Sequence, residues 1–160
     1  MSRSEALVRQ LTLRPHPEGG WYSEVFRSVR RVAPADGRGE RAALTTIYFL
    51  LAHGQRSCLH RVASDEAWHF YEGAPLHLVT CEPDFDRRDR TALGPWDGAT
   101  RPVHVVPAGH WQAAESTGEY TLVGCTVGPG FDFHDFSMLR DDPAAAGQLR
   151  ARHPDLAVWI

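Results

Sequence analysis

Short apolar segments separated by turn residues most strongly limit what this chain can fold into. Between residues 21 and 127, most apolar segments are brief, rich in β-branched and aromatic residues, and bounded by Gly, Pro or Asp. We expect strands at Trp21–Phe26, Leu44–Leu51, Ala67–Tyr71, Leu76–Cys81, Val103–Val106 and Tyr120–Val127. Many short strands at this spacing favour a β-sandwich or β-barrel over an alternating βαβ sheet.

Helices are predicted only near the two ends of the chain. Ser4–Leu11 reads as a short helix with Ser4 as its N-cap, and Asp141–Gly147 reads as a second short helix. The charged stretches Val29–Arg41 and Glu82–Arg90 are predicted to be exposed connections. The predicted fold is therefore all-β with a short helical segment at each end.

Composition limits the partners and the chemistry. The 160 residues suit one domain spanning 1–160, with 42% hydrophobic and 23% charged residues. The net charge of −3 lacks the excess of basic residues that is typical of nucleic-acid-binding proteins. No apolar run approaches the roughly 20 residues of a membrane span, and the charged N-terminus does not resemble a signal peptide. We therefore expect no membrane partner and a cytoplasmic protein. All 17 basic residues are arginine, which excludes lysine Schiff-base chemistry.

One segment has a more specific pattern of spacings. It runs from Gly54 through His60, Val62 and Glu66 to Gly73. A second segment, PAGHWQ, covers 107–112 and ends at Gln112. We place His60 on one strand and Glu66 at the start of its hairpin partner, with both side chains pointing into a barrel.

These two segments resemble the two cupin motifs. The first motif is a glycine, five residues, His-x-His, a glutamate and a later glycine, with Val62 here replacing the second histidine. In the second motif, Gln112 takes the place of a histidine. The chain also resembles one family of small single-domain cupins of unknown function. That likeness rests on PHPEGGWYSE at 15–24, LTTIYFLL at 44–51, SCLHRVASDEAWHFYEG at 57–73, VPAGHWQAA at 106–114 and LVGCTVGPGFDFHDF at 122–136. The resemblance implies a jelly-roll barrel over about 13–137 and a homodimer, without a known reaction.

The resemblance leaves a metal site as one hypothesis. Metal-dependent cupins use three histidines and a glutamate, of which this chain keeps His60 and Glu66, with Gln112 as a poor third ligand. A catalytic metal usually needs about three good protein ligands. A site of His60, Glu66 and Gln112 would hold Mn, Fe or Ni, for an oxygenase or isomerase reaction.

The favoured hypothesis uses no metal or other cofactor. Cupins related to sugar-nucleotide epimerases use the first-motif histidine to remove a proton next to a carbonyl group, which makes His60 the candidate acid or base. Glu66 would orient or share that proton. The predicted ligand is a small polar metabolite, carbohydrate-like or keto, and the predicted reaction is isomerisation or epimerisation. A third hypothesis is a non-catalytic binding protein.

Further residues are predicted to line the pocket because they share a strand face with these groups or lie beside them in sequence. Strand alternation puts Trp68 and Phe70 on the face of Glu66, and Tyr22 and Glu24 on one face of their own strand. Ser57 lies close to His60 in sequence. The predicted pocket therefore comprises His60, Glu66, Gln112, Trp68, Phe70, Ser57, Glu24 and Tyr22.

Overall fold

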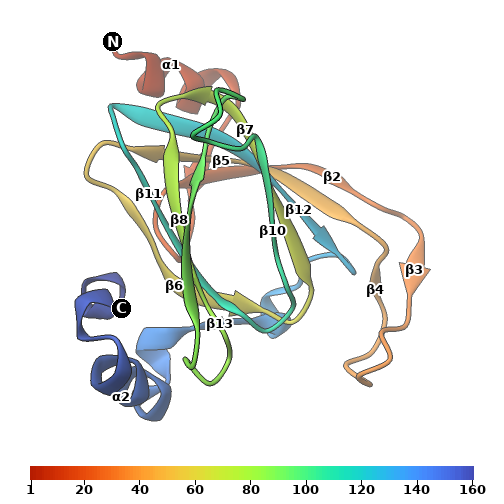
Figure 1. Cartoon of the computed structure of the whole chain (residues 1–160). Coiled ribbons are helices and arrows are strands. Elements are labelled where there is room, and N and C mark those ends of the chain that lie inside the picture. The colour runs from red at the N-terminus through yellow and green to blue at the C-terminus, as the bar shows by residue number, and fades with distance from the viewer.

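Two antiparallel sheets face each other across an apolar interior (Figure 1). The computed structural model describes every residue from 1 to 160. The six-stranded sheet has the order β1 (Arg14–Pro15), β2 (Trp21–Arg27), β5 (Thr45–Ala52), β12 (Tyr120–Gly128), β7 (Asp65–Gly73) and β10 (Val103–Val106). The five-stranded sheet has the order β13 (Phe136–Met138), β6 (Arg56–Val62), β11 (Trp111–Ser116), β8 (Leu76–Cys81) and β9 (Arg88–Leu93). The predicted all-β fold is confirmed.

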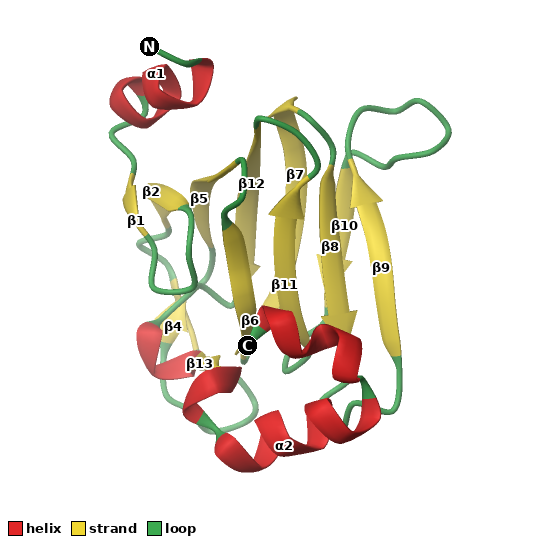
Figure 2. Cartoon of the chain, turned by 90° about the vertical axis from the view of Figure 1, so that its left-hand side faces the viewer, coloured by secondary structure: helices red, strands yellow, loops and turns green.

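The five-stranded sheet is buried on both faces. On β11, Gln112 and Ala114 point to the interior between the sheets, whereas Trp111 and Ala113 point to the opposite side. That outer side is covered by α2 (Pro143–Arg152) together with the 3-10 helices η2 (Leu139–Asp141) and η3 (Pro154–Trp159) (Figure 2). The second predicted helix is thus present, but it begins after the N-cap Asp142 and extends to Arg152.

The first helix begins earlier than predicted. α1 spans Arg3–Gln10, and its N-cap is Ser2 rather than Ser4. The Ser2 hydroxyl accepts from the backbone N–H of Glu5, whose carboxylate in turn accepts from the N–H of Ser2 at 2.7 Å. This reciprocal capping box outweighs the single cap that Ser4 would provide. No helix in the chain combines the length and apolar character needed to cross a membrane.

The strands carrying His60 and Glu66 are not hairpin partners, so that prediction was wrong. β6 pairs with β11 and β13, whereas β7 pairs with β12 and β10. The two-residue connection between them therefore crosses from one sheet to the other, although a short connection normally indicates a hairpin. His60 and Glu66 consequently approach the same interior space from opposite sheets.

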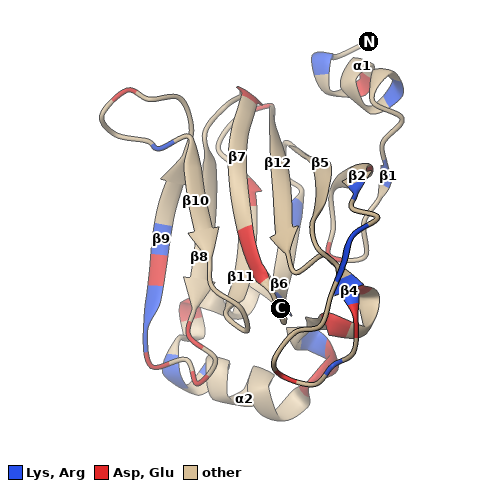
Figure 3. Ribbon diagram, turned by 90° about the vertical axis from the view of Figure 1, so that its right-hand side faces the viewer, with Lys and Arg blue, Asp and Glu red and all other residues tan.

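Charged residues are concentrated in β9, the edge strand of the five-stranded sheet, and in a two-stranded arm that lies outside both sheets. The predicted connection Glu82–Arg90 contains the start of β9, where Arg88, Asp89 and Arg90 alternate in charge along the strand (Figure 3). The predicted exposed stretch Val29–Arg41 contains β3 (Arg31–Val32) and the first residue of β4 (Arg41–Ala42), which pair as a two-stranded arm. As an edge strand with an open side, β9 lacks the apolar alternation by which a strand is recognised.

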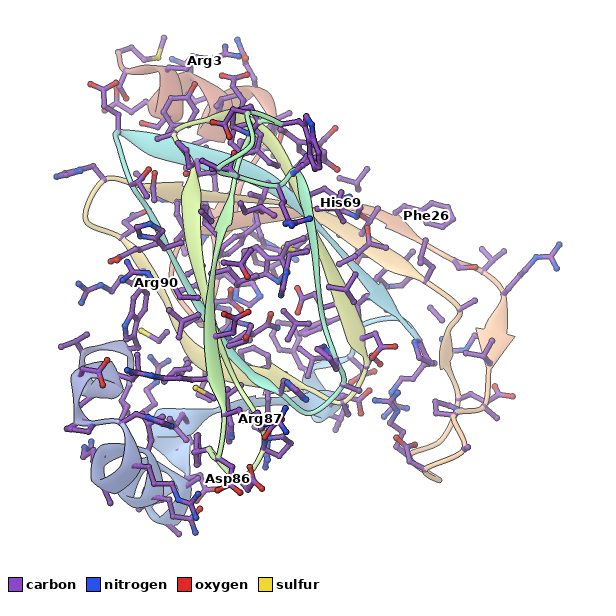
Figure 4. The ribbon with its side chains drawn as sticks, viewed as in Figure 1. Arg3, Phe26, His69, Asp86, Arg87 and Arg90 are labelled. Carbon is purple, nitrogen blue, oxygen red and sulfur yellow. The ribbon has the colours of Figure 1, made fainter.

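Apolar side chains also lie on the outer surface of the six-stranded sheet. Phe26, Tyr71, Val103 and Val105 are each about half exposed. Phe26 points outward from β2, on the side of the molecule opposite Asp86 and the helical C-terminal segment (Figure 4). The barrel therefore differs on its two sides, because α2 and the C-terminal 3-10 helices pack on one sheet, whereas α1 packs on the other only around Leu50 and Leu122.

Candidate functional site

A cavity of about 440 Å3 lies between the two sheets. Its buried end, which we call the floor, consists of His16, Glu18, His60 and Glu66. Its open end, which we call the mouth, consists of Arg14, Glu24, Arg27, Asp132 and His134. An aromatic wall connects the two and comprises Tyr22, Phe49, Phe131, Phe133 and Phe136. Thr45, Ile47, Val62, Cys125 and Val127 complete the lining.

Glu18 is the central residue of the floor. Its Oε2 atom lies 3.2 Å from Nε2 of His60 and 3.2 Å from Nδ1 of His16. Its Oε1 atom accepts a hydrogen bond of 2.8 Å from the Ser57 hydroxyl. One carboxyl group therefore contacts two imidazole rings and a hydroxyl in a space closed to solvent.

The turn between β1 and β2 holds Glu18 in this position. The backbone carbonyl of Glu18 accepts from the N–H of Cys58 at 2.8 Å, which attaches the turn to β6. Gly19, with φ +107°, packs so closely on β6 that an added Cβ would lie 2.1 Å from the carbonyl oxygen of Arg56. Only glycine tolerates both this backbone angle and this approach. The turn thereby carries residues of the six-stranded sheet across to the other sheet.

Backbone contacts fix the tautomer of His60. Its Nδ1 atom lies 2.8 Å from the carbonyl oxygen of Cys58. Because a carbonyl can only accept, Nδ1 must carry the hydrogen, which leaves the lone pair of Nε2 directed at Glu18. At His16, Nδ1 accepts from the backbone N–H of Glu18 at 3.3 Å. The lone pair of Nδ1 on His16 is thus used by this N–H, and only His60 offers a free lone pair to the Glu18 carboxyl.

Burial shifts every acid and base of the floor toward its neutral form. It raises the pKa of Glu18 to about 8 and lowers the pKa of His16 to about 3. Burial also lowers the pKa of His60 and raises the pKa of Glu66. At neutral pH the Glu18 carboxyl thus holds a proton and can donate a hydrogen bond to Nε2 of His60.

Gln112 and Trp68 lie behind Glu66 rather than in the cavity lining. Nε2 of Gln112 donates to Oε2 of Glu66 at 2.5 Å, and Oε1 of Gln112 accepts from Nε1 of Trp68 at 2.9 Å. Gln112 comes from β11 and the other two from β7, so these bonds join the two sheets across the interior. Gln112 therefore fixes the position of the Glu66 carboxyl.

The remaining predicted pocket residues divide into two groups. Tyr22 and Glu24 line the cavity, as do His60 and Glu66. Ser57 is fully buried beside Glu18 and Phe70 packs into the apolar interior, and neither lines the cavity. Phe70 shares a strand face with Glu66, but this does not bring its side chain to the cavity wall.

Sequence reasoning missed His16 and Glu18. Both belong to the PHPEGG segment, which was used only as a mark of family resemblance. The signal that could have identified them is a carboxylate and a histidine beside two adjacent glycines, since paired glycines permit close approach of backbone to another strand.

The floor does not fit the hypothesised metal centre. Val62 lines the cavity at the position of the second motif histidine, and both polar atoms of the Gln112 amide are already hydrogen-bonded. Only His60 and Glu66 of the hypothesised ligands remain, fewer than the three that catalytic sites usually require. No group of three or more His, Cys, Asp or Glu side chains in the chain is arranged to hold a metal ion.

The fold and the motifs agree with a comparison to known protein families. Residues 5–139 match the family described as Cupin superfamily (DUF985). The chain belongs to this family. Its jelly-roll barrel is shared with a cupin 2 conserved barrel domain protein from Rhodopseudomonas palustris, with a TM-score of 0.59 at 14% identity, over 92% of this chain and 84% of that one.

Two solved structures are similar to this cupin over nearly their whole length. A hypothetical protein from Leishmania major is 33% identical with a TM-score of 0.85, and the match covers 99% of this chain and 97% of that one. A protein from Shewanella oneidensis is 31% identical with a TM-score of 0.82, over 99% and 94% of the two chains. No curated protein sequence matches the chain. Membership of the superfamily supports small-molecule binding or cupin enzyme activity in general terms.

Proposed function

We propose that this cupin binds a small polar organic molecule in its cavity and moves a proton to and from it with His60 and Glu18. The observation that carries the proposal is the 3.2 Å contact between Nε2 of His60 and Oε2 of Glu18, inside a buried cavity floor. Burial keeps this acid and this base neutral, so Glu18 donates a hydrogen bond to His60 and His60 stays an unprotonated base.

Glu18 can free His60 to act as a base. Its Oε2 atom is equally far from His60 and His16, at 3.2 Å from each accepting nitrogen. Nδ1 of His16 already accepts from the backbone N–H of Glu18, so the Glu18 hydroxyl must turn from His60 into the cavity before Nε2 of His60 can accept a proton from a bound molecule. Once His60 has given that proton back, the hydroxyl can return to Nε2.

Glu66 supplies the second group that a proton abstraction next to a carbonyl needs. Its carboxyl is held by Gln112, and burial raises its pKa, which favours the protonated form that donates a hydrogen bond. The C–H bond of the substrate breaks as its proton moves to His60. The electron pair moves into an enolate, whose oxygen Glu66 stabilises. His60 then returns the proton to a neighbouring atom, which gives an isomer, or exchanges it with solvent before returning it to the same carbon.

The cavity suits a small keto or carbohydrate-like substrate. A volume of about 440 Å3 falls within the range of ordinary ligand pockets. Polar groups lie at the floor and at the mouth, while the wall between them is aromatic and can pack against a flat ring or a short chain. The reactive carbon would therefore lie at the buried end.

Exchange of substrate hydrogen for deuterium tests this proposal. The protein is incubated in heavy water with a panel of small keto compounds and sugars, and proton NMR follows the loss of the signal next to each carbonyl. We expect catalysed exchange by the wild type, and a reduction of roughly 10²- to 10⁴-fold in His60→Gln, the usual contribution of a general base.

His69→Gln is the matched control, because His69 lies on β7 outside the cavity lining. It should exchange at the wild-type rate, and thermal unfolding should show that both variants are folded. Exchange by folded His60→Gln at the wild-type rate would refute the role of His60. Binding of a compound without exchange would instead favour the non-catalytic hypothesis. A homodimer and a cytoplasmic location stay predictions from the sequence.

A further inference from the structure

Arg14 is a cation at the cavity mouth without an acidic partner. It lies opposite Tyr22 in the pairing of β1 with β2, so both side chains project from the same face of the sheet into the cavity. The centre of its guanidinium group lies 4.9 Å from the centre of the Tyr22 ring. The structure gives this guanidinium that aromatic contact but no hydrogen bond to a carboxylate.

The other charged groups of the mouth already have hydrogen-bond partners. Both oxygens of Glu24 accept from Arg27, at 3.1 and 2.7 Å, and Arg27 also donates to the carbonyl oxygen of Phe131. Asp132 contacts Nδ1 of His134 at 2.7 Å and accepts from the backbone N–H of the same residue. Arg14 therefore supplies the free positive charge of the cavity lining.

The floor presents no charge that would oppose an entering anion. Glu18 and Glu66 are buried and their carboxyl groups are engaged by Ser57 and Gln112. Burial raises the pKa of Glu18 to about 8, so at neutral pH it does not repel a negative ligand as a free carboxylate would, and burial raises the pKa of Glu66 as well. A negative group at the mouth thus meets Arg14, a guanidinium without an acidic partner.

We propose that the cavity takes a small organic carboxylate, whose carboxylate group binds Arg14 and whose planar or apolar part lies on the aromatic wall. This inference rests on the proposed function and narrows its substrate to a class, namely keto or hydroxy acids. A guanidinium group presents a planar fork of donors that matches a carboxylate with two parallel hydrogen bonds. A single guanidinium balances the single charge of a carboxylate, whereas a phosphate dianion would require further donors.

The contacts between Arg14 and the floor set the orientation of the bound acid. Arg14 lies over Tyr22, the ring centre of Tyr22 lies 4.6 Å from that of His16, and His16 contacts Glu18. An acid held at Arg14 would extend past these two rings toward the floor. Its keto or hydroxyl carbon, rather than its carboxylate, would then reach His60.

Binding of matched acids and neutral analogues tests this inference directly. The probes are phenylacetate with phenylacetamide and phenylpyruvate with its amide, and saturation-transfer NMR or tryptophan fluorescence gives their affinities. We expect the wild type to bind each acid roughly tenfold or more tightly than its amide, as one hydrogen-bonded ion pair provides. Arg14→Gln should remove this preference and leave the binding of the amides unchanged.

Arg9→Gln is the matched control, since Arg9 is an exposed arginine on α1 outside the cavity lining. It should keep the wild-type preference. Equal binding of acids and amides by the wild type, or an unchanged preference in Arg14→Gln, overturns the inference. So does the absence of acid binding up to roughly 10 mM, the weakest affinity expected for ligands of about ten heavy atoms. Tighter binding of phenyl phosphate than of phenylacetate would overturn the assignment to carboxylates.

The two proposals can fail separately. His60→Gln should still prefer acids over amides, because it leaves Arg14 in place. An acid preference without any exchange of substrate hydrogen would refute the proton-transfer proposal and support the carboxylate site. Catalysed exchange on neutral ketones alone, without an acid preference, would refute the carboxylate site and support the proton-transfer proposal.

Discussion

Replacing Glu18 by glutamine should abolish a loss of stability that the wild-type protein suffers between pH 4.5 and about 8. In the unfolded chain this carboxyl ionises near its ordinary pKa of 4.5, whereas burial raises its pKa in the folded protein to about 8. A group with a raised folded pKa contributes its stability in full below 4.5 and loses it as the pH rises through 8. The free energy of unfolding of the wild type should therefore fall, relative to Glu18→Gln, by about 1.4 kcal/mol per pH unit.

Urea unfolding at several pH values within that window measures this difference. The matched control is Glu72→Gln, because hydrogen bonds from Arg3 and Tyr120 lower the pKa of Glu72 to about 2. The stability linked to Glu72 is lost only as the pH falls from 4.5 toward 2, outside the window. Curves for the wild type and Glu18→Gln that run parallel from pH 4.5 to 8 would show that Glu18 is not held neutral.

Substituting alanine at Gly19 should destabilise the protein far more than the same substitution at Gly37. Both glycines have positive φ, at +107° and +77°. An added Cβ at Gly19 would lie 2.1 Å from the carbonyl oxygen of Arg56, whereas nothing lies within 4 Å of one at Gly37. We expect a loss of about 1 kcal/mol from backbone strain at Gly37, and roughly 3 kcal/mol or more at Gly19, where a clash with backbone is added.

Chemical unfolding of the two variants measures both losses of stability. The difference between them gives the cost of the clash with β6, because backbone strain is common to both. The Gly19 variant should also lose the exchange activity, since moving the turn off β6 carries Glu18 away from His60. Equal destabilisation of the two variants would show that β6 does not fix the turn.

The sequence predicts the barrel better than it predicts the depth of residues within it. Strands such as Leu76–Cys81 and Val103–Val106 were identified with their observed bounds, because alternation and turn residues act locally. β9 escaped recognition because its first three residues are charged and it lies at an edge. The crossing from β6 to β7 was not predicted, because a two-residue connection normally indicates a hairpin. The two strands lie in different sheets because each pairs with strands that are distant in sequence.

The part of the candidate site that the sequence predicted is the part carried by a motif whose residues all face the barrel interior. The spacing of His60 and Glu66 within one segment was sufficient to place both in the cavity. Gln112 and Trp68 also face the interior, but their hydrogen bonds to each other and to Glu66 place them behind the lining. His16 and Glu18 reach the floor through a turn that packs on the opposite sheet, and that contact spans about forty residues of sequence.

The ring nitrogens of His60 test the central claim most directly. In protein labelled with 15N at histidine, the signals of His60 are identified by their absence in His60→Gln. At neutral pH we expect a neutral ring with its hydrogen on Nδ1 and an Nε2 that accepts a hydrogen bond, which is lost in Glu18→Leu because leucine has no donor. A fully protonated ring, or a neutral ring with its hydrogen on Nε2, would contradict a proton held by Glu18 and offered to His60.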